Sequence, residues 1–365
     1  MSVPSSGLDG EAPPSSQIGV LGWMRANLFN GWFNTLLTIL AVYVLVRTVP
    51  PLIDWLFLSA TWGEVSPDEC KAASGACWTF VREKYRLILF GTYPFGEQWR
   101  PLAGLILLIT VIGVSCNRRF WRAWLLALWV GTLGVYLLLL GGGAFGLTPV
   151  RTDLWGGLPL TLLLAVVGMV VAFPIAILLA LGRRSDLPII KALCVGYIEL
   201  IRGVPLISLL FMASFMLPLF MPTGASIDAL LRAQVAIIMF VAAYLAEVIR
   251  GGLQALPKGQ YEGAAALGLT YWQMQIKVIL PQALKISIPP MVNTYLAMFK
   301  DTSLVAIVSL TDLLLATKQA IADPEWRAFF VEGYIFIALI YWCFSFFMSK
   351  YSQHLERVLD TELKH

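Results

Sequence analysis

Two short stretches of the sequence carry nearly the same five residues. Residues 199–203 read Glu-Leu-Ile-Arg-Gly and residues 247–251 read Glu-Val-Ile-Arg-Gly. Within each stretch the carboxylate and the guanidinium are three residues apart, so they share a helix face and can pair there or crosswise between helices. Both stretches adjoin long apolar segments, where an unpaired charge is costly. We expect interior charge pairs; the alternative is separate charges that extend to an interface. The residues concerned are Glu199, Arg202, Glu247 and Arg250.

A second stretch is rich in small residues. Residues 256–269 read Leu-Pro-Lys-Gly-Gln-Tyr-Glu-Gly-Ala-Ala-Ala-Leu-Gly-Leu. Pro257 predicts the start of a short helix with an acidic first turn, Gly268 predicts its end, and Thr270 is suited to cap a second helix. The result is a two-helix elbow over 257–272. Its small face would suit a groove on another protein, although an ordinary surface loop is the alternative. The docking residues would be Glu262, Gly263, Ala264, Ala265 and Gly268.

A third polar stretch, Lys-Asp-Thr-Ser-Leu at 300–304, directly follows an apolar segment. A polar cluster in this position often lines a cavity, so Asp301, Thr302 and Ser303 are candidates for contact with a substrate. The alternative is structural, because Thr302 or Ser303 can cap a following helix.

Two of the five cysteines, Cys70 and Cys77, lie seven residues apart in a polar loop. They can form a disulfide if the loop faces an oxidising compartment, and otherwise remain thiols. The other three lie in or beside apolar segments and are expected to pack there. The only histidines, His354 and His365, lie near the C-terminus, so we expect no metal site.

Motifs for nucleotide binding and hydrolytic catalysis are missing from the sequence. It contains no Gly-x4-Gly-Lys-Ser/Thr loop and no Gly-x-Ser-x-Gly turn. We therefore expect no enzyme and no cofactor in this chain itself.

The composition indicates that lipid surrounds most of the chain. Of its 365 residues, 58% are hydrophobic and only 13% are charged, whereas soluble domains carry about 25% charged residues. The net charge of +4 is spread out, without a basic arm, so no nucleic-acid partner is expected. We predict an all-α polytopic membrane protein with about eight transmembrane helices. The segments are 34–60, 101–116, 122–141, 157–181, 193–218, 230–250, 284–300 and 330–350.

Lysines and arginines in the short connections predict the orientation of these segments. They gather after the second, fourth, sixth and eighth segments, which would therefore end in the cytoplasm. Both termini are then cytoplasmic and loop 61–100 is periplasmic. The chain divides near residue 150. The predicted parts are a disordered tail (1–19), an extension with three transmembrane helices (20–150), a five-helix core (151–355) and a cytoplasmic tail (356–365).

The elbow resembles the Glu-Ala-Ala-x3-Gly-x9-Ile-x-Leu-Pro signature of ABC importer permeases. Glu262, Ala264 and Gly268 match it, as does the closing Leu-Pro at 280–281. Gly263 stands where the family has alanine, and Val278 stands where it has isoleucine. The departure at 263 loosens a helix by up to about 1 kcal/mol but keeps the surface small. The charged stretch with Pro205-Leu206 and the Lys-Asp-Thr-Ser-Leu stretch resemble polar amino-acid permeases of the histidine/glutamine type.

The resemblance covers residues 157–360. The three extra helices, the loop with Cys70 and Cys77, and Gly-Glu-Gln-Trp-Arg-Pro at 96–101 look like the M-type permease subunit of bacterial general L-amino-acid importers.

This resemblance implies a type I ABC importer permease core in the bacterial inner membrane, with the elbow as its coupling helix and the charge pairs in gating. It further implies an L-amino-acid substrate, a second homologous permease in a heterodimer, two cytoplasmic ATPases that bind ATP and Mg²⁺, and a periplasmic amino-acid-binding protein. The alternatives are a stand-alone secondary transporter or channel for small polar solutes, and a membrane-embedded enzyme. The former would place several unpaired carboxylates within the membrane, and the latter would need a clustered nucleophile or metal site.

Overall fold

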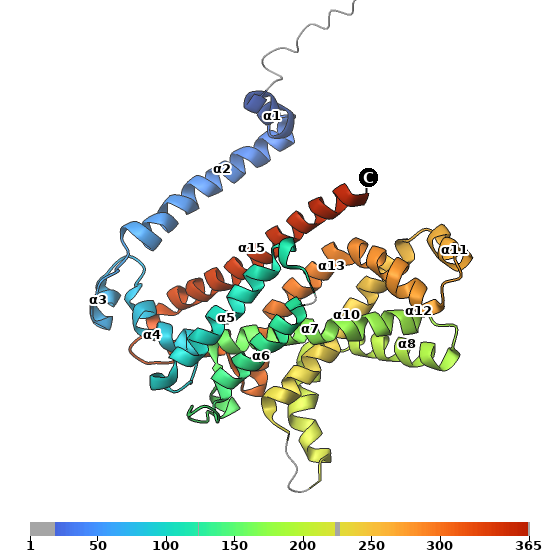
Figure 1. Ribbon diagram of the computed structural model, residues 1–365. Helices are drawn as coiled ribbons and strands as arrows, with labels where there is room; N and C mark the ends of the chain where they lie inside the picture. Colours follow the sequence, from blue (N-terminus) through green and yellow to red (C-terminus); the bar gives the residue numbers. More distant parts are fainter. Residues whose placement is uncertain (1–18, 123, 223–226, 364–365) are drawn as a thin grey trace, which may run out of the picture. The chain divides into compact units, whose positions relative to one another are not determined.

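The computed structural model describes residues 19–122, 124–222 and 227–363, which form helices with very little strand (Figure 1). Two compact units are present, Met1–Thr79 and Phe80–His365. Residues 1–18 of the predicted N-terminal tail lie outside the described residues. Of the predicted C-terminal tail, residues 356–363 continue the last helix.

The first unit contains one long apolar helix and a small folded loop. The helices are α1 (Gly19–Asn27), α2 (Trp32–Ile53), which continues through a π-helical turn (Asp54–Leu58), and α3 (Pro67–Ala72). At the start of α3 the Ser66 side chain accepts from the Glu69 N–H, and the Glu69 carboxylate accepts from the Ser66 N–H. This reciprocal cap satisfies two N–H groups that a helix start leaves without partners.

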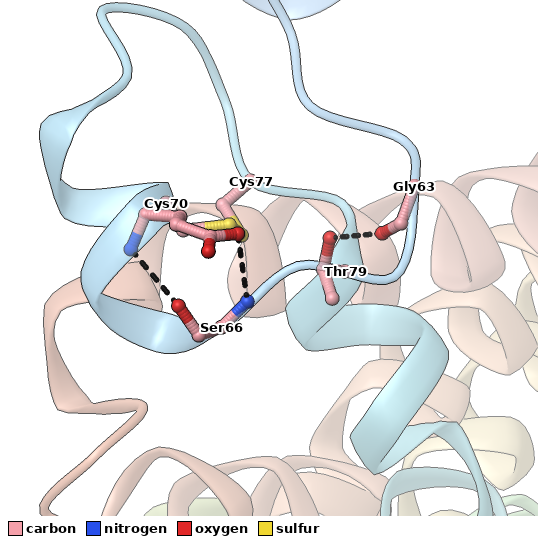
Figure 2. Close-up of a disulfide and its surroundings, with 6 residues drawn as sticks. Gly63, Ser66, Cys70, Cys77 and Thr79 are labelled. Carbon is pink, nitrogen blue, oxygen red and sulfur yellow. Dashed lines mark hydrogen bonds between the residues drawn. A yellow bond between two sulfur atoms is a disulfide. The ribbon is translucent and has the colours of Figure 1, made fainter.

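A disulfide joins Cys70 of α3 to Cys77, with 5.7 Å between their Cα atoms (Figure 2). The hydroxyl of Thr79 donates to the carbonyl of Gly63 at 2.7 Å in the same loop. Thr61 also pairs with the residues around Cys77, through a hydrogen bond of 2.8 Å from its N–H to the carbonyl of Ala76. The loop is therefore an ordered structure, held by a covalent crosslink and backbone pairing.

The second unit begins with the helices α4 (Thr79–Phe90), α5 (Trp99–Ser115) and α6 (Trp124–Gly141). Arg100 of α5 is completely buried. Its Nε donates to the carbonyl of Leu139 at 2.7 Å, and its Nη1 donates to the carbonyl of Thr148 at 2.9 Å. Because the last carbonyls of a helix have no partners within the helix, this guanidinium fixes the end of α6 and the loop after it.

The remaining helices of the second unit carry the candidate site. They are α7 (Gly157–Arg183), α8 (Pro188–Gly203), α9 (Leu206–Phe211), α10 (Ala229–Ala255), α11 (Lys258–Ala266), α12 (Tyr271–Met274), α13 (Leu280–Asp301), α14 (Leu313–Ile321) and α15 (Phe330–Leu363). Buried alanines line both α7 and α10, including Ala172, Ala176, Ala242 and Ala246. Small side chains let helix backbones approach closely in a membrane, and α7 and α10 pack against each other here.

The structure does not confirm the predicted number of eight spans. Among residues 19–122, 124–222 and 227–363, six helices are long and apolar enough to cross a membrane, or seven if α8 and the α9 segment, bent by 101°, count as one span. The predicted segment 284–300 does form a helix, α13. However, Lys285, Asn293 and other polar residues make α13 too polar to belong to that set.

A glycine-rich contact joins α4 to the start of α7. Gly91 and Gly157 both have positive φ, +59° and +64°. A Cβ on Gly157 would lie 2.1 Å from the carbonyl oxygen of Leu89, and one on Gly91 would lie 2.7 Å from the Cα of Gly156. Gly156 and Gly157 also pair with the two-residue strand β1 (Thr311–Asp312). Only glycine permits both this conformation and this approach.

The strand β1 leads directly into α14, whose N-cap is Asp312. Its carboxylate accepts hydrogen bonds from the N–H groups of Leu314 and Leu315, at 3.0 and 2.9 Å. The residue is completely buried. Burial raises the pKa of the Asp312 carboxyl to about 6, although these N–H groups and Lys318 act in the opposite direction.

Candidate functional site

The elbow, residues 257–272, is built as two short helices separated by a glycine. Helix α11 ends at Ala266, and Gly268 follows with φ of +71°. The N–H of Gly268 donates to the carbonyl of Ala265 at 2.9 Å, which satisfies one of the last carbonyls of α11. A Cβ on Gly268 would meet nothing within 4 Å, so backbone conformation, and not crowding, requires glycine here.

The second half of the elbow starts with a reciprocal cap. The Thr270 side chain and the Gln273 side chain each bond the other's backbone N–H at the start of α12. Both boundaries predicted from the sequence are therefore present. The predicted acidic first turn is wrong, because α11 begins at Lys258 and Glu262 falls in its second turn.

The five predicted docking residues differ in their exposure to solvent. Glu262, Gly263, Ala265 and Gly268 are exposed, whereas Ala264 is buried beneath them. Three large apolar residues that the sequence analysis did not single out are also exposed in the elbow. They are Leu267, Tyr271 and Trp272, with exposed fractions of 80%, 49% and 56%. Neighbouring exposed apolar side chains commonly mark an interaction surface.

Hydrogen bonds tie the elbow to three long helices. The hydroxyl of Tyr261 in α11 donates to the carbonyl of Leu253 in α10 at 3.1 Å and accepts from Arg184 Nη1, just after α7, at 2.8 Å. On the other side, Gln282 of α13 donates to Gln260 Oε1 at 3.0 Å. Figure 1 accordingly places α11 and α12 at the end of the core where α7 and α8 are joined.

The repeated Glu-x-x-Arg stretches meet at this same end of the core. Glu247 of α10 receives Arg250 through contacts of 2.8 to 3.1 Å. It also pairs with Arg202 of α8 at 3.6 Å, so pairing occurs both within a stretch and crosswise. Arg183 of α7 adds contacts of 2.8 Å to Glu199 and 3.0 Å to Glu247. We call Arg183, Glu199, Arg202, Glu247 and Arg250 the charge cluster.

Glu247 is the centre of the charge cluster. Its side chain is 14% exposed, and its three arginine partners are 21–36% exposed. Three guanidinium groups face two carboxylates, so one positive charge remains in excess. Attraction between charges strengthens as water is excluded, and a half-buried cluster of this kind links helices more firmly than separate surface charges do.

The three candidate residues in the stretch at 300–304 have different surroundings in the structure. Thr302 is buried, and its hydroxyl donates to the carbonyl of Phe299 at 2.7 Å, in the preceding turn of α13. It therefore does not cap the following helical turn as one reading suggested. Ser303 lines an open cavity of about 550 Å³ together with Lys300, Tyr334, Tyr341 and Ser345. Asp301 is half-buried at the end of α13.

The two cysteines that the sequence analysis singled out lie outside these clusters. Cys70 and Cys77 belong to the first unit, where they are bonded to each other. Within the described parts of the chain, no three His, Cys, Asp or Glu residues gather so as to hold a metal ion.

A bundle of long apolar helices, with paired charges and a short two-helix elbow at one end, is the architecture of a polytopic membrane protein. The family described as binding-protein-dependent transport system inner membrane component matches residues 172–360. The inner membrane amino-acid ABC transporter permease protein YhdY of Escherichia coli K12 is 51% identical over 93% of both chains. The glutamate/glutamine/aspartate/asparagine transport system permease protein BztC of Rhodobacter capsulatus is 40% identical over 96% of both.

This chain belongs to the family of inner membrane components of binding-protein-dependent transport systems. A solved crystal structure of an amino acid ABC transporter with histidines is 32% identical, covers 54% of this chain and 89% of that one, and aligns with a TM-score of 0.48.

Proposed function

We propose that this chain is the transmembrane permease subunit of an ATP-driven importer of L-amino acids, including polar, acidic and neutral ones. The observation that carries the proposal is the elbow, whose exposed small residues around a positive-φ glycine form a surface suited to another protein. The names of the relatives YhdY and BztC, both alike over nearly the whole chain, support an amino-acid substrate.

The transporter would contain more than this chain. A second homologous permease, in a heterodimer, would complete the pathway. Two ATPases would bind ATP and Mg²⁺ and receive the elbow, and a binding protein would deliver the substrate. The elbow and both termini would lie in the cytoplasm, and loop 61–100 in the periplasm. Support for this orientation comes from the lysines and arginines near the elbow, since such residues favour the cytoplasmic side.

In this mechanism, closure of the ATPases on ATP displaces the elbow, and the elbow moves the helices that it contacts. The central pathway then alternates between outward-facing and inward-facing states. The charge cluster would act as a gate at the inner end, because its ion pairs join α7, α8 and α10. Asp301, Thr302 and Ser303 would lie along the pathway, where a substrate's ammonium and carboxylate need polar partners.

The decisive experiment measures import and ATP hydrolysis together, in proteoliposomes with the whole transporter. Gly268→Phe forces a side chain into a left-handed backbone conformation, and Glu262→Lys reverses a charge on the docking surface. Both should reduce the number of amino acids imported per ATP at least tenfold while the chain remains in the membrane.

Matched controls are Gly146→Phe, at a glycine that also has positive φ (+78°) and whose Cβ would meet nothing within 4 Å, and Glu325→Lys, at an exposed carboxylate. Undiminished import by both elbow variants would refute the docking role. Import by the purified chain without an ATPase would instead favour a stand-alone transporter.

A further inference from the structure

Two consecutive arginines at the end of α7 contact different functional parts of the molecule. Arg184 is the C-cap residue of α7, just beyond its last helical residue. Its Nη1 donates to Tyr261 Oη of the elbow at 2.8 Å and to the carbonyl of Leu253 at 3.0 Å. The guanidinium carbon also lies 5.4 Å from the centre of the Tyr261 ring. Arg184 thus holds α11 through both the hydroxyl and the ring face.

The carbonyl of Leu253 is the shared acceptor of this contact. It belongs to the last turn of α10, where carbonyls lack partners within the helix. Arg184 and Tyr261 both donate to it. The ends of α7 and α10 and the start of the elbow are therefore joined at one oxygen atom.

Arg183, one residue earlier, contacts the charge cluster instead. Its Nη1 lies 2.8 Å from Glu199 of α8 and 3.0 Å from Glu247 of α10. Glu247 precedes Leu253 by less than two turns of the same helix. The end of α7 is consequently fixed to α10 at two levels, and only a single peptide unit separates the level of the elbow from the level of the charge cluster.

We infer that Arg183 and Arg184 are the positioning residues that transmit displacement of the elbow to the charge cluster. Arg184 and Tyr261 make the elbow move with the ends of α7 and α10. Arg183 converts this movement into a change in the ion pairs that hold α8. This assignment rests on the proposed function, and it adds a specific route by which docking on the ATPases would reach the gate.

The test uses the whole transporter in proteoliposomes and measures amino acids imported per ATP hydrolysed. Tyr261→Phe removes the hydroxyl and keeps the ring, and Arg184→Gln removes the charge. Each loses hydrogen bonds to a charged or carbonyl group at a partly exposed site, so the import per ATP should fall roughly fivefold. Co-purification of the ATPase should be unchanged in Arg184→Gln, because Arg184 lies outside the elbow. Arg184→Lys, which keeps the charge but not the planar donor pair, should restore part of the loss.

Double variants separate a transmitting role from a local one. If Arg183 and Arg184 act on one route, the double variant Tyr261→Phe with Arg183→Gln should import little less per ATP than the more impaired single variant. Tyr85→Phe on α4 and Arg327→Gln near α15, both exposed and outside the elbow, α7, α8 and α10, are the matched controls.

Several results would overturn the inference. Additive losses would mean that the elbow and the charge cluster act independently. A normal ratio of import to hydrolysis in Tyr261→Phe would also overturn the inference. If the transporter with Arg184→Gln does not assemble, the result for Tyr261→Phe decides alone. If Gly268→Phe and Glu262→Lys uncouple import from ATP hydrolysis while the Tyr261 and Arg184 variants do not, only this inference fails. If none uncouples, the proposed function fails first.

Discussion

Neutralising Glu247 should weaken the packing of α7, α8 and α10 measurably. Glu247→Gln keeps the side-chain volume but removes the charge that three arginines share. Two unit charges at about 3 Å attract by roughly 5 kcal/mol at an effective dielectric constant of about 20, before desolvation is counted. Breaking a fully buried pair costs about 3–5 kcal/mol, and breaking an exposed pair costs about 1 kcal/mol or less.

The exposure of the charge cluster places it between these limits. The Glu247 side chain is 14% exposed and that of Arg250 is 27% exposed. We therefore expect Glu247→Gln to lower the free energy of unfolding by about 2 kcal/mol. The loss has two parts, the absent attraction and the repulsion among guanidinium groups left with Glu199 alone.

The measurement is reversible unfolding of the purified full chain by sodium dodecyl sulfate in mixed micelles, followed by circular dichroism. Glu325→Gln, at an exposed position, is the control. The double variant Glu247→Gln with Arg250→Gln should lose less than the sum of the single losses, because the second change removes an uncompensated charge. A loss in Glu247→Gln no larger than in the control would show that these side chains are independent interfacial charges, and the reasoning would be refuted.

Three further perturbations test other parts of the structure. Cys70 and Cys77 should resist alkylation until reduced, and replacing both by serine should destabilise the first unit by about 2–3 kcal/mol, measured by proteolysis of the loop; alkylation without reductant would contradict this. Because the folded pKa of Asp312 is raised, the unfolding free energy should fall as pH rises from about 4 through about 6. Asp312→Asn should flatten this dependence, whereas Asp153→Asn should not. Arg100→Ala should cost about 3 kcal/mol in the same unfolding assay, because it removes the hydrogen bonds that a fully buried guanidinium makes to the carbonyls of Leu139 and Thr148; a loss below about 1 kcal/mol would show that other donors replace it.

Local signals in the sequence were sufficient for the elbow. A helix end at Gly268 and a cap at Thr270 depend on neighbouring residues only, and both are present. The start of α11 was less predictable, because Pro257 permits a helix to begin at the next residue or a little later. The pairing of Glu247 with Arg250 was equally local, since three residues on a helix fix the distance.

Contacts between distant segments could not be predicted in the same way. Arg183 and Arg184 are among the basic residues after the fourth predicted segment and entered the prediction only through its orientation, because nothing in their local sequence relates them to Glu247 or Tyr261. Their roles depend on how α7 packs beside α10, which is decided by alanines spread over both helices. The predicted number of eight spans is not confirmed for a related reason. α13 is polar enough that its place depends on its neighbours in the bundle and not on its own hydropathy.

The glycine contact between α4 and α7 bears on how a minimal version of this protein could be engineered. A truncation at residue 151 would look natural, since the family match and most recognisable motifs come later. It would, however, remove the backbone around Leu89 and Gly91 that packs against Gly156 and Gly157. The surface uncovered in this way lies beside the strand β1, which leads into α14. A shortened chain should therefore begin near Phe80, and a fusion partner is better attached there than at the apparent start of the core.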